Sequence, residues 1–426
     1  MRATDRLTTA RTGALTAALT AALTALVLGV SFASPASAQQ LGAPKQKMSV
    51  YEVDERTAKR LQAALIAVSV EDWDEAAKQL SRLRPRSLNP LERQKASEVH
   101  AFVAFGRGQH AAARQHFEDA IAEGEMTPEQ QAETRYRIAQ LYLTDEMWPE
   151  VIEHLNRWFE IAPNPSPAAY YVLALAYYQN DDLEGALEPA SQACQRSDAP
   201  EESWLQLLLA IHLTRKDYKA SIPVLEELVM RFPKKNYWLS LSTVHGALGD
   251  YEEALVPLQL AYTQGELDED GELRRLAQLL LFLGLPYRAA NVIETELASD
   301  RISADAESYE LLGNSWIAAR EFDKTIEPLT RAAEMASDGD IFVRLAQVQI
   351  QREKWVAASV ALGRALELGD LKKPGDAKLL MGIAAYNSER PKQARSWFTR
   401  ARSHEETRKE ADQWLMHLDR EQQQAS

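Results

Sequence analysis

The repeat that decides the fold is clearest in Gly249-Asp250-Tyr251-Glu252-Glu253-Ala254, where a turn leads to an aromatic residue and, three positions later, to a small one. Residues 71–76, which read EDWDEA, have the same form. If this small residue is taken as an anchor, ten copies follow one another along the chain: Ala76, Ala113, Val151, Ala186, Ser221, Ala254, Ala290, Thr325, Ala358 and Ala394. Neighbouring anchors are 33 to 38 residues apart, so the chain is predicted to be a tandem array.

Two further positions recur around the anchors. Twelve residues before them, eight of ten residues are small: Ala64, Ala101, Ala139, Ala174, Leu209, Ser242, Gln278, Gly313, Ala346 and Gly382. Four residues after them, nine of ten are apolar: Leu80, Phe117, Leu155, Ala190, Leu225, Leu258, Glu294, Leu329, Leu362 and Phe398. Residues four apart share one face of a helix. Each copy is therefore predicted to be a closely packed pair of antiparallel helices.

This pattern resembles the tetratricopeptide-repeat (TPR) family over residues 57–403. The resemblance implies an all-α fold, an α-α superhelix or TPR solenoid of about ten helix pairs, because each pair buries its apolar face only by stacking on its neighbours. After the last copy, Ala411, Trp414, Leu415 and Leu418 follow the i, i+3, i+4, i+7 spacing of one apolar helix face. Residues 404–426 are therefore predicted to form a C-terminal capping helix and tail.

The N-terminus has the three parts of a secretory leader. Arg2, Arg6 and Arg11 precede an apolar stretch over residues 13–32, and residues 36–38 read ASA, a small-residue cleavage pattern. We expect residues 1–38 to be a signal peptide and residues 39–56 to be a linker leading into the first helix. An uncleaved N-terminal anchor is the alternative. The remainder contains no apolar run long enough for a transmembrane helix, so we expect none in the mature chain.

The charge and cysteine content limit the kinds of partner and the sources of stability. The net charge is −14, and the leader carries three Arg and one Asp, a net +2, so its removal leaves −16. This acidic balance argues against nucleic acid as a partner. The single cysteine, Cys194, excludes an intrachain disulfide, so packing alone must hold the fold together.

The sequence carries no recognisable catalytic or metal-binding motif. The histidines show no metal-ligand spacing, and there is neither a glycine-rich phosphate loop after a strand nor a GxSxG turn. We therefore expect a protein that is not an enzyme and that needs no cofactor or metal. A cell-wall hydrolase is the alternative from a different functional class.

The first helices of such repeats line a concave face that commonly binds peptides or helices. The repeat register places nine residues on this face: Tyr136, Gln140, Tyr171, Leu175, Tyr178, Gln206, Phe282, Asn314 and Gln347. Tyrosines are frequent anchors of protein interfaces. These residues are therefore the candidate partner-binding groove, and the alternative for each is simple packing against the adjacent helix.

A closer resemblance is carried by residues 233–239 (PKKNYWL), 261–265 (AYTQG) and 284–290 (GLPYRAA). They are similar to periplasmic TPR proteins associated with TonB–ExbB–ExbD energy-transduction systems. This resemblance implies a soluble periplasmic adaptor whose protein partners are TonB- or ExbD-like periplasmic segments. A scaffold for envelope assembly or for a secretion complex is the alternative within the same class.

Overall fold

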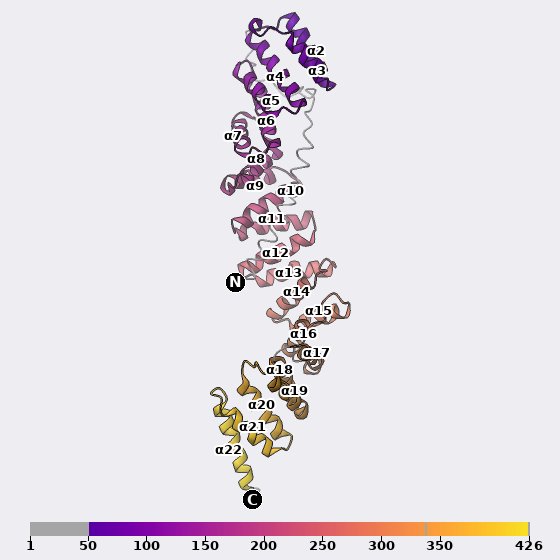
Figure 1. Ribbon diagram of the computed structural model, residues 1–426, viewed down its shortest axis with the longest axis vertical. Coiled ribbons are helices and arrows are strands. Elements are labelled where there is room, and N and C mark those ends of the chain that lie inside the picture. The colour runs from indigo at the N-terminus through magenta and orange to yellow at the C-terminus, as the bar shows by residue number, and fades with distance from the viewer. Residues whose placement is uncertain (1–50, 337–338, 425–426) are drawn as a thin grey trace. The chain divides into compact units, whose positions relative to one another are not determined.

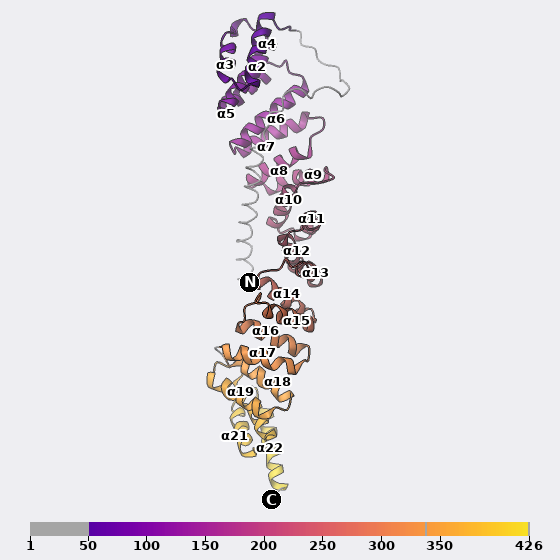
Figure 2. The ribbon, with the colours of Figure 1, turned by 90° about the vertical axis from the view of Figure 1, so that its right-hand side faces the viewer.

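The structure is a computed structural model that describes residues 51–336 and 339–424 (Figures 1 and 2). The predicted signal peptide, its cleavage site and residues 39–50 lie outside the described residues. Over the described ranges the chain forms 21 α-helices and one short 3-10 helix, with no strand. None of these helices is both long enough and apolar enough to cross a lipid bilayer.

The helices fall into two compact units, whose boundary in the sequence lies between Val224 and Leu225. The first unit contains α2 (Glu55–Ser69), α3 (Trp73–Ser81), η1 (Pro85–Ser87), α4 (Pro90–Gly106), α5 (His110–Ala122), α6 (Pro128–Thr144), α7 (Trp148–Ile161), α8 (Pro167–Gln179), α9 (Leu183–Gln195), α10 (Glu202–Thr214) and the start of α11 (Tyr218–Arg231).

The second unit contains the end of α11 and every later helix. These are α12 (Lys235–Leu248), α13 (Tyr251–Thr263), α14 (Asp270–Phe282), α15 (Pro286–Ala298), α16 (Ala306–Ala318), α17 (Phe322–Met335), α18 (Asp340–Gln351), α19 (Trp355–Leu368), α20 (Pro374–Asn387), α21 (Pro391–Ala401) and α22 (Arg408–Gln424).

Within each unit, an even-numbered first helix packs against the odd-numbered second helix that follows it, and that second helix packs on the next first helix (Figure 1). The ten residues predicted as anchors lie in the core, each 2% exposed or less. At Gly313 an added Cβ would collide with the side chain of Leu329, so the small residue on the first helix makes room for the large one on the second. The predicted all-α fold of about ten helix pairs is confirmed.

The seventh pair corrects the predicted register by one residue. Every other second helix begins three residues before its anchor, and α15 begins at Pro286, three residues before Ala289. The anchor of this pair is therefore Ala289 and not Ala290. The prediction was wrong because Tyr287 supplied the aromatic signal, although Tyr287 is the second residue of its helix.

The corrected register explains two of the three exceptions in the predicted pattern, and Leu209 remains the third. Gln278 and Glu294, which the sequence placed at core positions, are exposed. One residue earlier in each case, Ala277 and Ile293 are completely buried. All ten pairs thus have a small residue or Leu twelve positions before the anchor and an apolar residue four positions after it.

The turns within the pairs share one backbone geometry. Five residues before each corrected anchor, the chain adopts a positive φ at Glu71, Gly108, Glu146, Asp181, Lys216, Gly249, Gly284, Arg320, Glu353 and Glu389. In each turn the next residue donates its backbone N–H to a carbonyl near the end of the first helix, as in Asp250 to His245 at 3.0 Å. This is the Schellman arrangement, which ends the first helix and reverses the chain.

The last helix covers the end of the second unit. Ala411 and Leu418 of α22 are buried, and the Trp414 ring stacks on Phe398 with centroids 5.2 Å apart and planes 8° apart. An ion pair between Arg395 and Asp419 joins α21 to α22 at 2.6 Å. The predicted C-terminal capping helix is confirmed.

Candidate protein-binding face

Side chains on the first helices of the first unit form one candidate surface, which we call the first-helix face. We define it by six half-buried side chains that stand fifteen, eleven or eight residues before their anchors: Glu98 and Phe102 on α4, Tyr136 and Gln140 on α6, Tyr178 on α8 and Gln206 on α10. The face is therefore aromatic and amide-rich, with few charges.

Tyr136 is held firmly in place by an aromatic cluster. Its ring centroid lies 5.0 Å from Trp158, which contacts Phe159 at 4.9 Å, and Phe159 contacts Tyr170 at 4.6 Å. The guanidinium of Arg196 lies over Tyr170 at 4.8 Å. Burial raises the pKa of the Tyr136 hydroxyl, so this group stays protonated and able to donate a hydrogen bond. A ring fixed in this way loses little entropy when a partner packs on it.

The helix that carries Tyr136 is well specified by its sequence. Thr127 accepts a hydrogen bond from the backbone of Gln130, whose side chain binds back to the Thr127 backbone, and Pro128 occupies the first helical turn. This capping box fixes the start of α6, and Tyr136 and Gln140 then project one turn apart on one side of it. Among the described residues, the side chains of Gln140 and Tyr178 have no hydrogen-bond partner, so both are available to a ligand.

Two predicted groove residues are part of the core and not of the surface. Tyr171 is 2% exposed and Leu175 is 1% exposed. Trp204 of α10 stacks on Tyr171 with ring centroids 6.0 Å apart and covers it. For these two residues the structure shows the alternative, packing against the adjacent helix.

The remaining predicted residues lie in the second unit. Phe282 is 68% exposed and meets the Tyr251 ring edge-on at 4.8 Å. Asn314 is half-buried, and its side-chain oxygen accepts a hydrogen bond from Arg344 at 2.9 Å. Gln347 is exposed. These three residues are therefore described within the second unit by itself.

Ion pairs link successive first helices of the second unit. Lys235 of α12 binds Asp268 at 2.5 Å and Glu272 of α14 at 3.3 Å. Arg274 of α14 similarly binds Asp305 at 2.8 Å. These charges are satisfied within the chain. The first unit has a comparable pair at one step, where Arg93 of α4 binds Glu123, just ahead of α6, at 2.7 Å.

Glu98 and Phe102 were not identified from the sequence, although the same spacing rule applied to the anchor Ala113 finds both. Phe102 packs edge-on against Phe117 at 5.5 Å, and the guanidinium of Arg137 lies over its ring at 5.1 Å. Burial raises the pKa of Glu98 above that of an ordinary glutamate.

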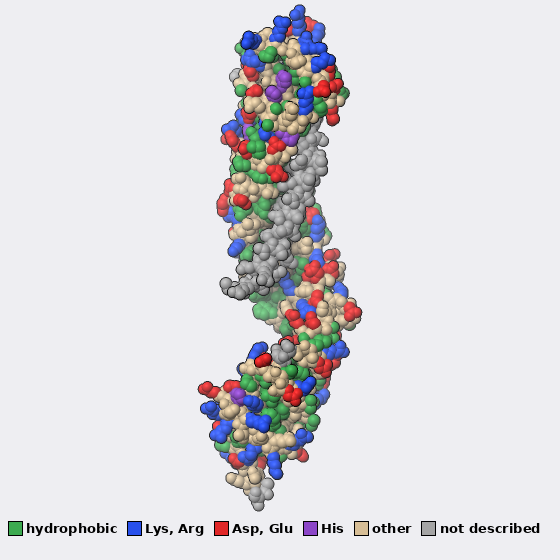
Figure 3. Space-filling model, in the orientation of Figure 1, with side chains coloured by type: hydrophobic (Ala, Val, Ile, Leu, Met, Phe, Trp, Pro, Cys, Tyr) green, Lys and Arg blue, Asp and Glu red, His purple; other side chains and the backbone are tan. Residues whose placement is uncertain are grey.

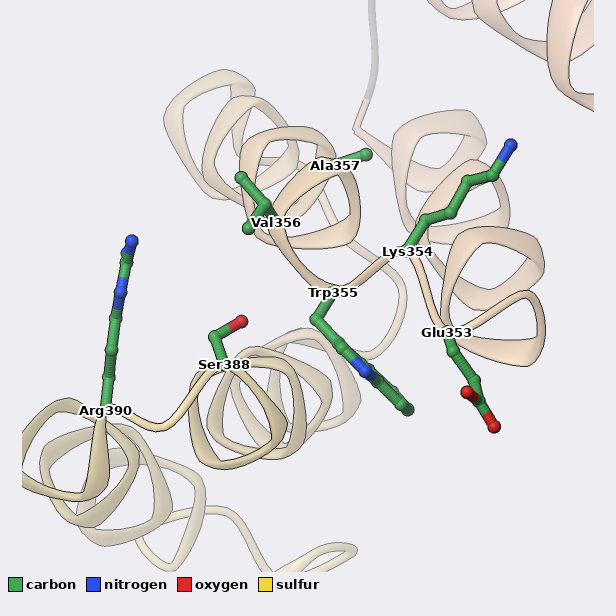
Figure 4. A pocket seen from close by; sticks show the side chains of 7 residues that line it. All are labelled: Glu353, Lys354, Trp355, Val356, Ala357, Ser388 and Arg390. Carbon is green, nitrogen blue, oxygen red and sulfur yellow. The ribbon is translucent and has the colours of Figure 1, made fainter.

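No three His, Cys, Asp or Glu side chains within residues 51–336 and 339–424 are arranged to hold a metal ion. A hollow of about 460 Å³ in the second unit is lined by residues 353–357, Ser388 and Arg390. Figure 4 shows that Lys354 and Glu353 point in different directions around it. The hollow therefore lacks the converging polar groups typical of a ligand pocket.

Charge is distributed unevenly over each unit. In the space-filling view, Lys and Arg side chains gather over the N-terminal helices of the first unit and over α20–α22 of the second (Figure 3). The acidic residues that precede and begin α14 are engaged by Lys235, and contacts with Asp268 and Glu272 raise the pKa of that lysine.

No protein-family model matches the sequence, and no curated protein matches it. Among solved structures, the chain is similar to the protein MamA, with 20% identity and a TM-score of 0.35, over 41% of this chain and 93% of that one. It is also similar to a tetratricopeptide repeat protein from Parabacteroides merdae, with 15% identity and a TM-score of 0.35, over 70% of this chain and all of that one. A third similarity is to Naa15/Naa10 bound to HypK-THB, with 11% identity, a TM-score of 0.42, and 85% and 66% of the two chains covered. The helix pairs, buried anchors and left-handed turns of this chain form a TPR-type architecture.

Proposed function

We propose that this chain is a non-enzymatic scaffold that binds a segment of another protein on the first-helix face. The observation that carries the proposal is the rigid Tyr136 ring, with Gln140 one turn along α6 and Tyr178 on the next first helix, α8. Among the described residues, the side chains of Gln140 and Tyr178 have no hydrogen-bond partner. A fixed aromatic anchor beside free hydrogen-bonding groups is the composition of protein-interface hot spots.

The finer proposal is an accessory role in the periplasm, in a TonB–ExbB–ExbD type system that energises outer-membrane transport. The similarity of residues 233–239 and 284–290 to TPR proteins of such systems supports it, as does the leader-like pattern of residues 1–38. The bound segment would then belong to a TonB- or ExbD-like partner.

Site-specific photo-crosslinking in living cells tests both levels of the proposal. A photoreactive residue at Gln140 should trap a partner, and the same residue at Glu188, which is exposed on the second helix α9, should trap far less. Recovery of a TonB-system component from Gln140 supports the finer role. Recovery of an envelope-assembly or secretion protein instead would support the scaffold role and refute the TonB assignment. Equal trapping at Gln140 and Glu188 would refute the proposed face.

A further inference from the structure

Glu310 of the second unit shows how a glutamate on a first helix obtains a cationic partner from the next first helix. Glu310 stands fifteen residues before its anchor, and Arg344 of the next first helix binds its carboxylate at 2.7 Å. The same guanidinium donates to Asn314, which stands eleven residues before the anchor, at 2.9 Å. One arginine thus neutralises the carboxylate and holds the neighbouring amide.

The first unit has the same positions but not the same contacts. Glu98 and Arg137 are the register equivalents of Glu310 and Arg344. Phe102 stands where the second unit has Asn314, and Arg137 lies over the Phe102 ring while its guanidinium binds Glu133. Glu98 is left with a hydrogen bond from Gln94 at 3.1 Å and, among the described residues, with no ion pair.

The carboxylate of Glu98 is therefore half-buried and lacks a contacting cation. Burial raises its pKa, the more distant charges of Lys95 and Arg137 oppose that effect, and Glu133 adds to it. An ionised carboxylate that is partly removed from water is stabilised by a cation brought close to it. The cation contact that Arg344 makes with Glu310 in the second unit is thus not made at Glu98 by the described residues of the first.

We propose that the first-helix face binds a peptide segment bearing lysine or arginine, whose cation pairs with Glu98 while a neighbouring apolar side chain packs on Tyr136. The inference rests on the proposed function and specifies the chemistry of the partner. Tyr136 stands at the register position of Glu98 on the next first helix, so one extended segment reaches both. The net charge of −14 also favours a cationic partner over an acidic one.

Selection from a phage library of short random peptides on the purified protein tests this chemistry. The wild type should enrich peptides with lysine or arginine beside an apolar residue. Glu98→Gln keeps the size of the side chain and its bond to Gln94, and it should bind the selected peptides about tenfold more weakly. Glu188→Gln makes the same charge change on a second helix, and it should bind as the wild type does.

The outcomes separate this inference from the proposed function. If Tyr136→Ala abolishes binding of the selected peptides and Glu98→Gln leaves it unchanged, the face is correct and the cationic partner is wrong. If neither substitution weakens binding, both the face and the cation site are wrong. Helicity and melting temperature are measured for each variant, and Glu98→Gln should be at least as stable as the wild type, because it removes a half-buried unpaired charge.

Discussion

Gly382 of α20 lies so close to Phe398 of α21 that a Cβ on the glycine would overlap the phenylalanine ring. These residues stand twelve positions before and four positions after the anchor Ala394, and Phe398 is completely buried. The packing of a pair thus depends on one small residue that admits one large one.

Gly382→Ala should lower the stability of the second unit by about 1–3 kcal/mol, because overpacking a close contact forces the ring or the helices to move. Gly246→Ala is the matched control: Gly246 also lies within a helix, and an added Cβ there meets nothing within 4 Å. The control should gain roughly 0.5–1 kcal/mol. Chemical denaturation followed by circular dichroism measures both, and an equal effect of the two substitutions would refute this packing account.

At the left-handed turn position, replacing a glycine should lower the stability of the protein, and introducing a glycine should raise it. Gly249 has φ 86° and open space around it, so Gly249→Ala should cost about 1 kcal/mol through backbone strain alone. Lys216 adopts φ 62° at the same position of another pair, so Lys216→Gly should stabilise the protein by up to about 1 kcal/mol. Thermal melts of the two variants check the signs, and a stabilising Gly249→Ala would contradict the geometry.

The capping helix should contribute through Trp414. Trp414→Ala removes the ring that stacks on Phe398 and should cost about 2 kcal/mol, less than for a fully buried tryptophan. Met416→Ala, at a side chain of the same helix that is 52% exposed, is the control and should change little. Hydrogen exchange should speed up in α21 and α22 only for the tryptophan variant. Unchanged protection in that variant would show that α22 does not stabilise the last pair.

His154 predicts a loss of stability in acid. It is 7% exposed and stacks on Tyr142 at 5.1 Å, and burial lowers its pKa despite the nearby Glu118. The unfolded chain therefore takes up this proton more readily than the folded one. Stability from this site is complete above the unfolded pKa of about 6.5, and it falls as the pH drops from there toward the folded value.

The variant His154→Phe retains an aromatic ring without the titrating group, so its stability should fall less than that of the wild type between about pH 7.5 and about pH 5.5. Urea denaturation at both pH values gives the comparison. If wild type and variant lose the same stability, His154 does not carry the effect.

The fold could be predicted from the sequence because the repeat is defined by the sizes of side chains at fixed positions. Small anchors such as Ala76 and large partners such as Leu80 must recur wherever two helices meet closely. The seventh pair was misread because Ala289 and Ala290 are both small and both buried, so only the start of the helix distinguishes them.

The candidate site was less predictable, because register fixes which way a side chain points but not what covers it. Tyr171 and Tyr136 occupy the same register position, but only Tyr171 is sealed, by Trp204 of the next pair. Within the described part of the chain Glu98 makes no ion pair, because Arg137 lies over Phe102 and binds Glu133 instead, a side-chain arrangement that the repeat pattern does not specify.

The central claim, that this chain binds a protein partner through Tyr136 and its neighbours, is tested most directly by partner recovery. The double variant Tyr136→Ala, Tyr178→Ala, with helicity confirmed, is compared with the wild type by co-purification of the partner trapped from Gln140. If these anchors contribute about 2 kcal/mol or more of binding free energy, their loss should lower recovery of the partner at least tenfold. Recovery equal to that of the wild type by a correctly folded double variant would contradict the account.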